Sequence, residues 1–456
     1  MSILGDGQAN NRPPAAPSEK NVPIRVGLFV IFVLTVVLHT AWGIYFWTAA
    51  PTRAPKTSLR YEGEQYLASY PGWNTSNERD AASYNRAVVE VRRTGVPRTQ
   101  EGGLFSKGAL YAYFLTACYW LGGTRLLSVV IPQAILVALS GVLIALTARR
   151  IARQSSEVAA IIAACLVLIY IRFATWAGYI DPACLVLFIY ASATYLVSGT
   201  LTPGRTALLA VLMIAGIYTH GAFFLAASVT MLWLLICFRM DRRPAQLIGA
   251  CAIVVGVIVS IVLNIGHQDS MQEDQRALMW QANNPWYESM HLSGHWDNRY
   301  WYNRMVASDY SSDFTPEQGR RYLQYLERTG GDRSKASLLW ARENPGQYAK
   351  LCWLRLTAVL GPGLDYNARL GMVASTVWWL LVFPAGFYGL WRYRADRITW
   401  LALLTIGAEV SFATFILASA RYCVPMYLWL AVYAGVTYAT LGSRFFTAAV
   451  AARRVS

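Results

Sequence analysis

The chain has 456 residues, of which 55% are hydrophobic and only 14% are charged. This composition excludes an ordinary soluble protein, in which about a quarter of the residues are charged. The formal net charge of +15 is concentrated in short basic clusters between apolar runs, so a nucleic-acid partner is not needed to explain it.

The first three segments are a polar tail, an apolar run and a polar loop. Residues 1–22 include "NNRPPAAPSEKN" and predict a disordered cytoplasmic tail. The run from Ile24 to Trp47 predicts a spanning helix that delivers the chain to the outer side, because Lys20 and Arg25 stay inside. The outer loop 52–106 contains "DAASYNRAVVEVRR", whose valines suit a helix lying on the bilayer surface.

The next apolar segment, 107–123, is shorter than the roughly 20 residues that a span needs. We expect it to be re-entrant, because a full crossing would place the basic sequence "TARRIARQ" outside. The remaining apolar runs predict further spans at about 126–148, 157–177, 182–199, 206–219, 222–238, 246–266, 372–391, 399–419 and 424–441.

These runs predict an all-α polytopic membrane protein with about ten transmembrane helices, re-entrant or juxtamembrane helices and a helical outer-side loop domain. Its expected parts are the tail 1–22, an N-terminal transmembrane module 23–266, the outer domain 267–370, the C-terminal transmembrane helices 371–442 and a basic cytoplasmic tail 443–456. Basic residues at 149–153, 239–243 and 392–397 predict that these loops face the cytoplasm. The seven cysteines lack paired spacing and mostly lie in apolar runs, which is typical of small buried side chains.

Polar residues gather at the predicted outer ends of the helices. Each has a plain structural explanation, since an aspartate caps a helix, a lysine or arginine reaches the interface, and a histidine beside Gly221 completes a tight hairpin. Together, two carboxylates, several cations and a histidine on one membrane face indicate a hydrated site. The residues are Asp80, Lys107, Arg172, Asp181, His220, Arg421 and Tyr422.

Such a site suits transfer from a lipid-linked phosphate. Arg421 offers bidentate hydrogen bonds to the phosphate, and Lys107 adds a second positive charge. A carboxylate can take the proton of an acceptor hydroxyl as it attacks the anomeric carbon of a sugar, and we favour Asp80 for this role. The cations stabilise the phosphate as it leaves.

The order of these motifs resembles the GT-C superfamily of polyprenyl-phosphate-sugar glycosyltransferases, with bacterial protein O-mannosyltransferases and the lipid A aminoarabinose transferase the most similar in pattern. The resemblance covers about residues 24–442 and includes Asp80 and Tyr84 in "DAASY", Lys107 in "SKGALYAYFL", "GYIDPACLVLFIYASATYLV" after a second outer acid, "YTHGAFF", "ARENPGQYAKLCWLRL" and "RYCVP". His220 stands where a lysine or arginine is commoner, and the double proline usual after the lysine is absent.

The resemblance implies a multi-spanning enzyme of the inner (plasma) membrane with its site facing the periplasm or exterior. It implies a polyprenyl-phosphate-linked sugar donor, a hydroxyl acceptor on a glycan, lipid or protein, and inversion at the anomeric carbon. Asp80 would be the catalytic carboxylate and Asp181 a second catalytic acid. The substrate-binding residues would be Lys107, His220, Arg421, Tyr422, Tyr84 and Arg172.

Other functions and other site residues also fit the sequence. A ligase or polymerase of preassembled oligosaccharides has similar requirements, and a lipid-linked glycan transporter would carry ionisable residues inside its spans, where Glu409 lies. A non-catalytic membrane scaffold is a further alternative. Glu62 in "YEGEQY" competes with Asp80 as the acid. His291, His295 and Asp297 have a spacing compatible with a divalent metal, although histidines in such loops are commonly surface residues.

Overall fold

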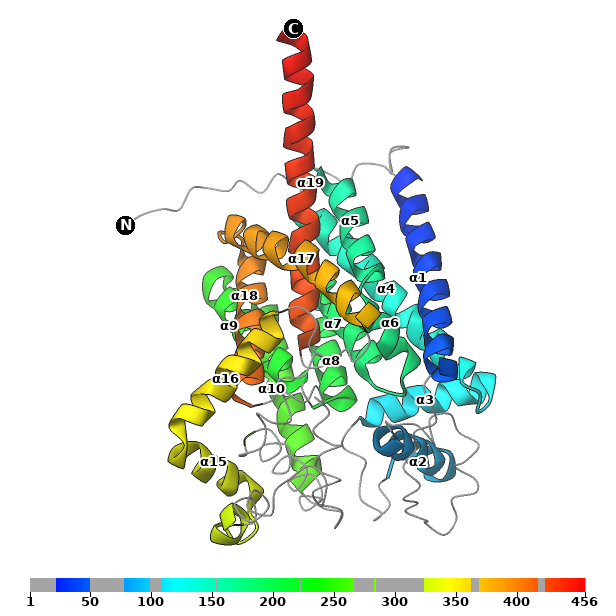
Figure 1. Ribbon diagram of the computed structural model, residues 1–456, viewed down its shortest axis with the longest axis vertical. Coiled ribbons are helices and arrows are strands. Elements are labelled where there is room, and N and C mark those ends of the chain that lie inside the picture. Colours follow the sequence, from blue (N-terminus) through cyan, green and yellow to red (C-terminus); the bar gives the residue numbers. More distant parts are fainter. Residues whose placement is uncertain are drawn as a thin grey trace.

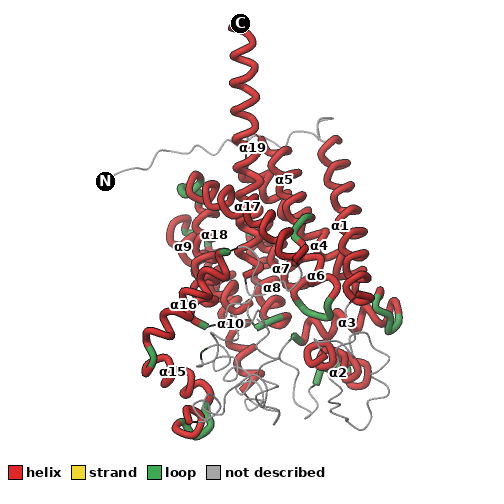
Figure 2. Tube along the Cα trace, viewed as in Figure 1, coloured by secondary structure: helices red, strands yellow, loops and turns green. Residues whose placement is uncertain are grey.

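The computed structural model describes residues 22–49, 78–98, 108–152, 155–221, 223–265, 283, 324–361, 369–416 and 423–455. The elements labelled in Figures 1 and 2 are all helices. They are α1 (Val22–Ala49), α2 (Glu78–Thr94), α3 (Ala109–Gly122), α4 (Leu127–Ala152), α5 (Ser156–Leu168), α6 (Ile171–Gly178), α7 (Ala183–Val197), α8 (Pro203–Thr219), α9 (Phe223–Asp241), α10 (Pro244–Ile265), α15 (Arg333–Glu343), α16 (Pro345–Leu360), α17 (Arg369–Arg392), α18 (Arg397–Phe415) and α19 (Val424–Val455).

Within the described ranges, six helices are long and apolar enough to cross a membrane, namely α1, α4, α9, α17, α18 and α19. The bent pair α5 and α6 makes a seventh if it counts as one span, and α7, α8 and part of α10 are shorter apolar helices. The predicted all-α membrane class is therefore confirmed. The total of ten spans stays a prediction, because three of the expected crossings fall on the shorter helices.

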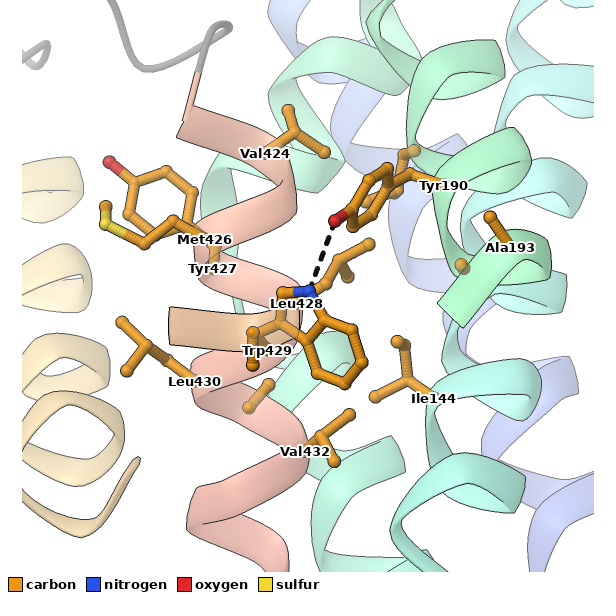
Figure 3. Close-up of a cluster of buried hydrophobic side chains, with 14 of the residues drawn as sticks. Ile144, Tyr190, Ala193, Val424, Met426, Tyr427, Leu428, Trp429, Leu430 and Val432 are labelled. Carbon is orange, nitrogen blue, oxygen red and sulfur yellow. Dashed lines mark hydrogen bonds between the residues drawn. The ribbon is translucent and has the colours of Figure 1, made fainter. Parts of the chain in front are cut away.

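Helix α19 forms the centre of the bundle (Figure 1). The side chains from Val424 to Val436 are almost entirely buried, and Trp429 and Tyr433 are fully buried. Small residues allow this close packing, since a Cβ on Gly435 would lie 2.9 Å from the Cβ of Ala163 on α5. Figure 3 shows Trp429 surrounded by aliphatic side chains, with its indole Nε1 directed at the hydroxyl of Tyr190 on α7.

The expected span 157–177 is interrupted near Tyr170, where α5 and α6 meet at a bend of 52°. The N–H of Tyr170 bonds to the carbonyl of Val167 instead of continuing the α-helical pattern to Leu166. The indole N–H of Trp378 donates to the released Leu166 carbonyl at 2.7 Å, and the Trp378 ring stacks on Tyr170 with centroids 3.9 Å apart. The bend is thus stable because a neighbouring helix satisfies the freed backbone group.

Helix α1 packs on α4, α5 and α6 along one side. Its backbone approaches α6 closely, because a Cβ on Gly178 would lie 3.0 Å from the Cα of Gly43. The indole of Trp42 also donates to the hydroxyl of Thr175 at 3.3 Å. The opposite side carries exposed apolar residues, as expected for a surface that faces lipid, and includes Phe29, Val33, Val37 and Tyr45.

Helices α2 and α3 lie across the lower end of the bundle in Figure 1, beneath α1 and α4. The apolar side of α2 packs against α3, with Tyr84 and Val88 in one buried cluster with Tyr111 and Leu115. The prediction that this side of α2 lies on the bilayer is therefore wrong for Val88, which is fully buried. The segment expected to be re-entrant is an uninterrupted helix, α3.

Two of the predicted cytoplasmic loops meet at the C-terminal end of α9. The guanidinium of Arg397, the first residue of α18, forms an ion pair with Asp241 at 2.5 Å, and the indole of Trp233 donates to the carbonyl of Arg397 at 3.1 Å. The basic clusters 239–243 and 392–397 are therefore neighbours. The side of the membrane on which they lie stays a prediction.

Candidate functional site

The structure describes the side chains of four of the eight predicted site residues, namely Tyr84, Arg172, Asp181 and His220. Asp80 lies in the first turn of α2, two residues after its start, so it is not at the N-cap position that was one explanation for it. The predicted residues that lie outside the described part of the chain are Lys107, Arg421, Tyr422, Glu62, His291, His295 and Asp297.

Three segments of the predicted site meet at Gly108. A Cβ placed on Gly108 would lie 3.0 Å from the carbonyl oxygen of Thr219 and 3.0 Å from a ring carbon of Tyr84. Gly108 follows Lys107 and caps α3, Thr219 ends α8 just before His220, and Tyr84 lies one helical turn after Asp80. The described segments next to Asp80 and His220 thus meet at Gly108, which follows Lys107 in the sequence.

A buried hydrogen-bond network joins this contact to the turn that carries Asp181. The Tyr111 hydroxyl on α3 donates to Oε1 of Gln133 on α4 at 2.8 Å. Nε2 of Gln133 donates to the carbonyls of Ala177 at 3.0 Å and Tyr179 at 2.7 Å, at the end of α6. Gln133 and Tyr111 are both fully buried. One amide therefore holds α3, α4 and the α6–α7 turn in a fixed relation.

The ring of Tyr111 also contacts Tyr84 edge to face, with centroids 4.8 Å apart. Burial, followed by the charge of Asp181, raises the pKa of Tyr111 well above its ordinary value. The hydroxyl consequently stays protonated and keeps donating to Gln133.

Asp181 itself is 6% exposed and has a structural role. Its Oδ1 accepts a hydrogen bond of 2.9 Å from the N–H of Ala183, the first residue of α7, directly after Pro182. The predicted cap position is one residue off, because the N-cap of α7 is Pro182, but the Asp181 carboxylate still satisfies an N–H that has no partner within the helix. Its predicted catalytic role stays a prediction.

Arg172 lies in the first turn of α6, just after the bend that follows α5. Its side chain is 5% exposed, so its charge is enclosed by the protein. An enclosed guanidinium requires hydrogen-bonding or charged surroundings, which fits a polar site more readily than a side chain reaching from a helix end to water.

His220 is the C-terminal cap of α8 in the tight α8–α9 connection. Its N–H donates to the carbonyl of Gly216, and its own carbonyl accepts from Phe223, both at 2.9 Å. The expectation that Gly221 supplies the freedom for this turn is wrong, because Gly221 does not have a positive φ. The glycine that the hairpin requires is Gly216, where a Cβ would lie 2.2 Å from the Phe223 ring.

Sequence reasoning missed the residues that hold the site together. Gln133 and Asn85 are fully buried amides, and Asn85 accepts from the Tyr119 hydroxyl at 2.9 Å, which joins α2 to α3. The available signal was a single glutamine in the apolar run "VVIPQAILVALS", because an amide in such a run requires buried partners.

The described side chains do not supply a metal donor set. No group of three His, Cys, Asp or Glu residues comes together within the described ranges. The residues that suggested a divalent metal, His291, His295 and Asp297, lie outside those ranges.

Comparison with protein-family models and with curated protein sequences gives no match. Comparison with solved structures finds the archaeal oligosaccharyltransferase AglB of Archaeoglobus fulgidus, described in complex with an inhibitory peptide and a dolichol-phosphate. The TM-score is 0.49 at 14% identity, over 95% of this chain and 52% of that one. An Archaeoglobus fulgidus oligosaccharyltransferase tethered to an acceptor peptide gives 0.46 at 13% identity, over 91% and 50%. A complex of that protein with Zn and sulfate gives 0.46 at 14% identity, over 90% and 49%. The chain thus spans about half the length of these structures.

Proposed function

We propose that the protein is a membrane glycosyltransferase that moves a sugar from a polyprenyl-phosphate donor to an acceptor hydroxyl. The observation that carries this proposal is the meeting of α2, α3 and α8 at Gly108. It brings together the segments that bear a carboxylate, a lysine and a histidine, although these segments are far apart in the sequence. In this proposal a lipid-linked substrate reaches this end from the bilayer.

In this proposal the cations hold the donor phosphate. Lys107 and Arg421 provide charge and hydrogen bonds, with His220, Arg172 and Tyr422 completing the polar surroundings. Tyr84 supports the same end of α3, where its ring packs on Tyr111. Because Asp181 already accepts from the backbone of α7, we give it a secondary role in orienting substrate.

The reaction requires one general base. The acceptor oxygen attacks the anomeric carbon and its proton passes to Asp80, while the bond between that carbon and the phosphate oxygen breaks. The phosphate keeps the electron pair of the broken bond, and the cations stabilise its charge. A single displacement of this kind inverts the anomeric carbon. We place the site on the periplasmic or outer face of the inner (plasma) membrane, as the basic loops predict.

The transporter alternative relied on Glu409 as an ionisable group inside a span. In the structure the Glu409 carboxylate accepts a hydrogen bond of 2.9 Å from the backbone N–H of Met426, so it has a structural partner in α19. This contact favours the enzyme over the transporter. An oligosaccharide ligase or polymerase uses the same chemistry and differs in the donor that it accepts.

The test is sugar transfer by the purified protein in lipid, with polyprenyl-phosphate monosaccharides and lipid-linked oligosaccharides supplied separately. Asp80→Asn should lower turnover by roughly 10² to 10⁴, because an amide cannot accept the proton. Its folding should be nearly unchanged, since an acid in the first turn of a surface helix contributes only about 0.3–1 kcal/mol.

Two matched variants locate the base. Asp181→Asn should reduce turnover less than Asp80→Asn, because the amide oxygen of asparagine can still accept from Ala183. Glu62→Gln tests the competing acid of the same loop. Normal turnover by a well-folded Asp80→Asn protein rules out Asp80 as the base, and a loss confined to Glu62→Gln transfers the role to Glu62.

A further inference from the structure

A buried carboxylate on α18 holds the beginning of α19. Glu409 is 4% exposed and lies inside an apolar span. Its Oε2 accepts a hydrogen bond of 2.9 Å from the backbone N–H of Met426. A carboxylate enclosed in this way is costly unless it has hydrogen-bond partners, so the contact with Met426 explains how the fold accommodates Glu409.

The start of α19 needs an acceptor supplied from elsewhere. The first N–H groups of a helix have no partner within it, and in α19 the second residue is Pro425, which has no N–H. Met426 is therefore an early N–H that requires an acceptor. Glu409 provides this acceptor from a neighbouring helix.

A second polar contact fixes α19 one turn further along. The indole N–H of Trp429 donates to the Tyr190 hydroxyl on α7 at 3.1 Å, as the dashed line in Figure 3 shows. The same hydroxyl lies 3.2 Å from the hydroxyl of Thr405, one turn before Glu409 on α18. Helix α7 begins just after Asp181. These contacts therefore position α19 against α18 and against α7, the helix that follows Asp181.

The end of α18 is held by the outer helix α16. The Tyr348 hydroxyl donates to the carbonyl of Phe415 at 3.2 Å, and the buried guanidinium of Arg355 donates to the carbonyl of Thr414 at 3.4 Å. Residues on both sides of the connection 417–422 are thus anchored by polar contacts. In the sequence, Arg421 and Tyr422 directly precede the part of α19 that Glu409 holds.

We propose that Glu409 is a positioning residue that sets the start of α19 and, through it, the Arg421–Tyr422 pair for the donor phosphate. The inference rests on the proposed function, which assigns Arg421 to the phosphate. Glu409 touches backbone and not substrate. Its loss should therefore weaken donor binding more than it slows the chemical step.

The test compares Glu409→Leu with Glu409→Gln. Leucine removes the acceptor, and we expect the KM for a polyprenyl-phosphate monosaccharide to rise on the order of 10-fold, with a smaller change in kcat, because a buried backbone N–H at the start of α19 is left unsatisfied. Glutamine keeps an acceptor oxygen at a similar reach, so its KM should stay within about 3-fold of the unmodified protein. Amide hydrogen exchange of peptides covering 424–430 should accelerate in the leucine variant and not in the glutamine variant.

Thr437→Val is the matched control. Thr437 is buried on the same helix and donates to the carbonyl of Ala385 at 2.9 Å, remote from the start of α19. This variant should lose thermal stability without a change in KM. Glu409→Asp, which keeps the carboxyl group but shortens the side chain, gives an intermediate KM and serves if the leucine variant does not fold.

Wild-type turnover together with an unchanged KM in Glu409→Leu, or in Glu409→Asp where the leucine variant does not fold, overturns the positioning role and leaves the proposed function intact. An equal rise of KM in Glu409→Leu and Thr437→Val also overturns it, because the effect then follows general stability. Absence of both transfer and donor binding in the unmodified protein instead refutes the proposed function, and the positioning role falls with it.

Discussion

The hydroxyl of Tyr111 donates to the side-chain carbonyl of Gln133 across a distance of 2.8 Å, and both residues are fully buried. The Gln133 amide group then donates to two backbone carbonyls at the end of α6. The relative position of α3 and the α6–α7 turn therefore depends on one side chain of α4.

Replacing Gln133 should lower the stability of the protein more than removing the hydroxyl of Tyr111. Gln133→Leu removes the hydrogen-bond partner of the Tyr111 hydroxyl and of the carbonyls of Ala177 and Tyr179. Each buried group left unsatisfied lowers the free energy of unfolding by about 1–3 kcal/mol. Tyr111→Phe leaves only the Gln133 carbonyl unsatisfied. Thermal unfolding of the purified protein should therefore show a larger loss of Tm for Gln133→Leu than for Tyr111→Phe. Equal losses would mean that the two bonds to the α6 end contribute nothing.

The second prediction concerns the contact at Gly108. Gly108→Ala introduces a methyl group 3.0 Å from both the Thr219 carbonyl and the Tyr84 ring, so α2 and α8 must move apart. We expect a loss of transfer activity of at least about 10-fold, because sub-ångström displacement of site residues impairs alignment. Gly204→Ala is the control, since a Cβ there meets nothing within 4 Å. Similar activity in the two variants would remove Gly108 from the site.

The third prediction is the topology, tested with a matched pair of cysteines. Gly204 and Gly346 each follow a proline in the first turn of a helix, are exposed, and have open space at the Cβ position. In a background lacking the seven native cysteines, Gly346→Cys should react with an impermeant maleimide in intact cells. Gly204→Cys should react only after permeabilisation, because the basic loops predict a cytoplasmic position. The reverse pattern would place the site on the cytoplasmic side.

The membrane class was predictable because it depends on long apolar runs, which are a property of the sequence alone. The broken span 157–177 was not, since the bend near Tyr170 depends on Trp378, a residue of α17 that satisfies the Leu166 carbonyl. A partner from a distant helix leaves no mark in the local hydropathy. The same reason explains the wrong prediction for Val88, because the valine-rich side of α2 suits either a bilayer surface or another helix.

A helix start near Asp181 was predictable because this aspartate and the following proline are neighbours in the sequence, although α7 begins only at Ala183. The meeting of Tyr84, Gly108 and Thr219 was expected only as a shared membrane face, because topology gives the side of the membrane and not which helices touch. Gln133 and Asn85 were missed because a lone amide in an apolar run shows the need for partners without identifying them.

Helix α19 has 32 residues and is therefore about 48 Å long, well beyond the roughly 30 Å of a bilayer core. Its far end projects past the other helices in Figure 1, whereas its beginning is fastened to Glu409. A continuous helix is stiff along its axis, because each turn is bonded to the next. An axial displacement of the projecting end is consequently transmitted along the helix to Met426.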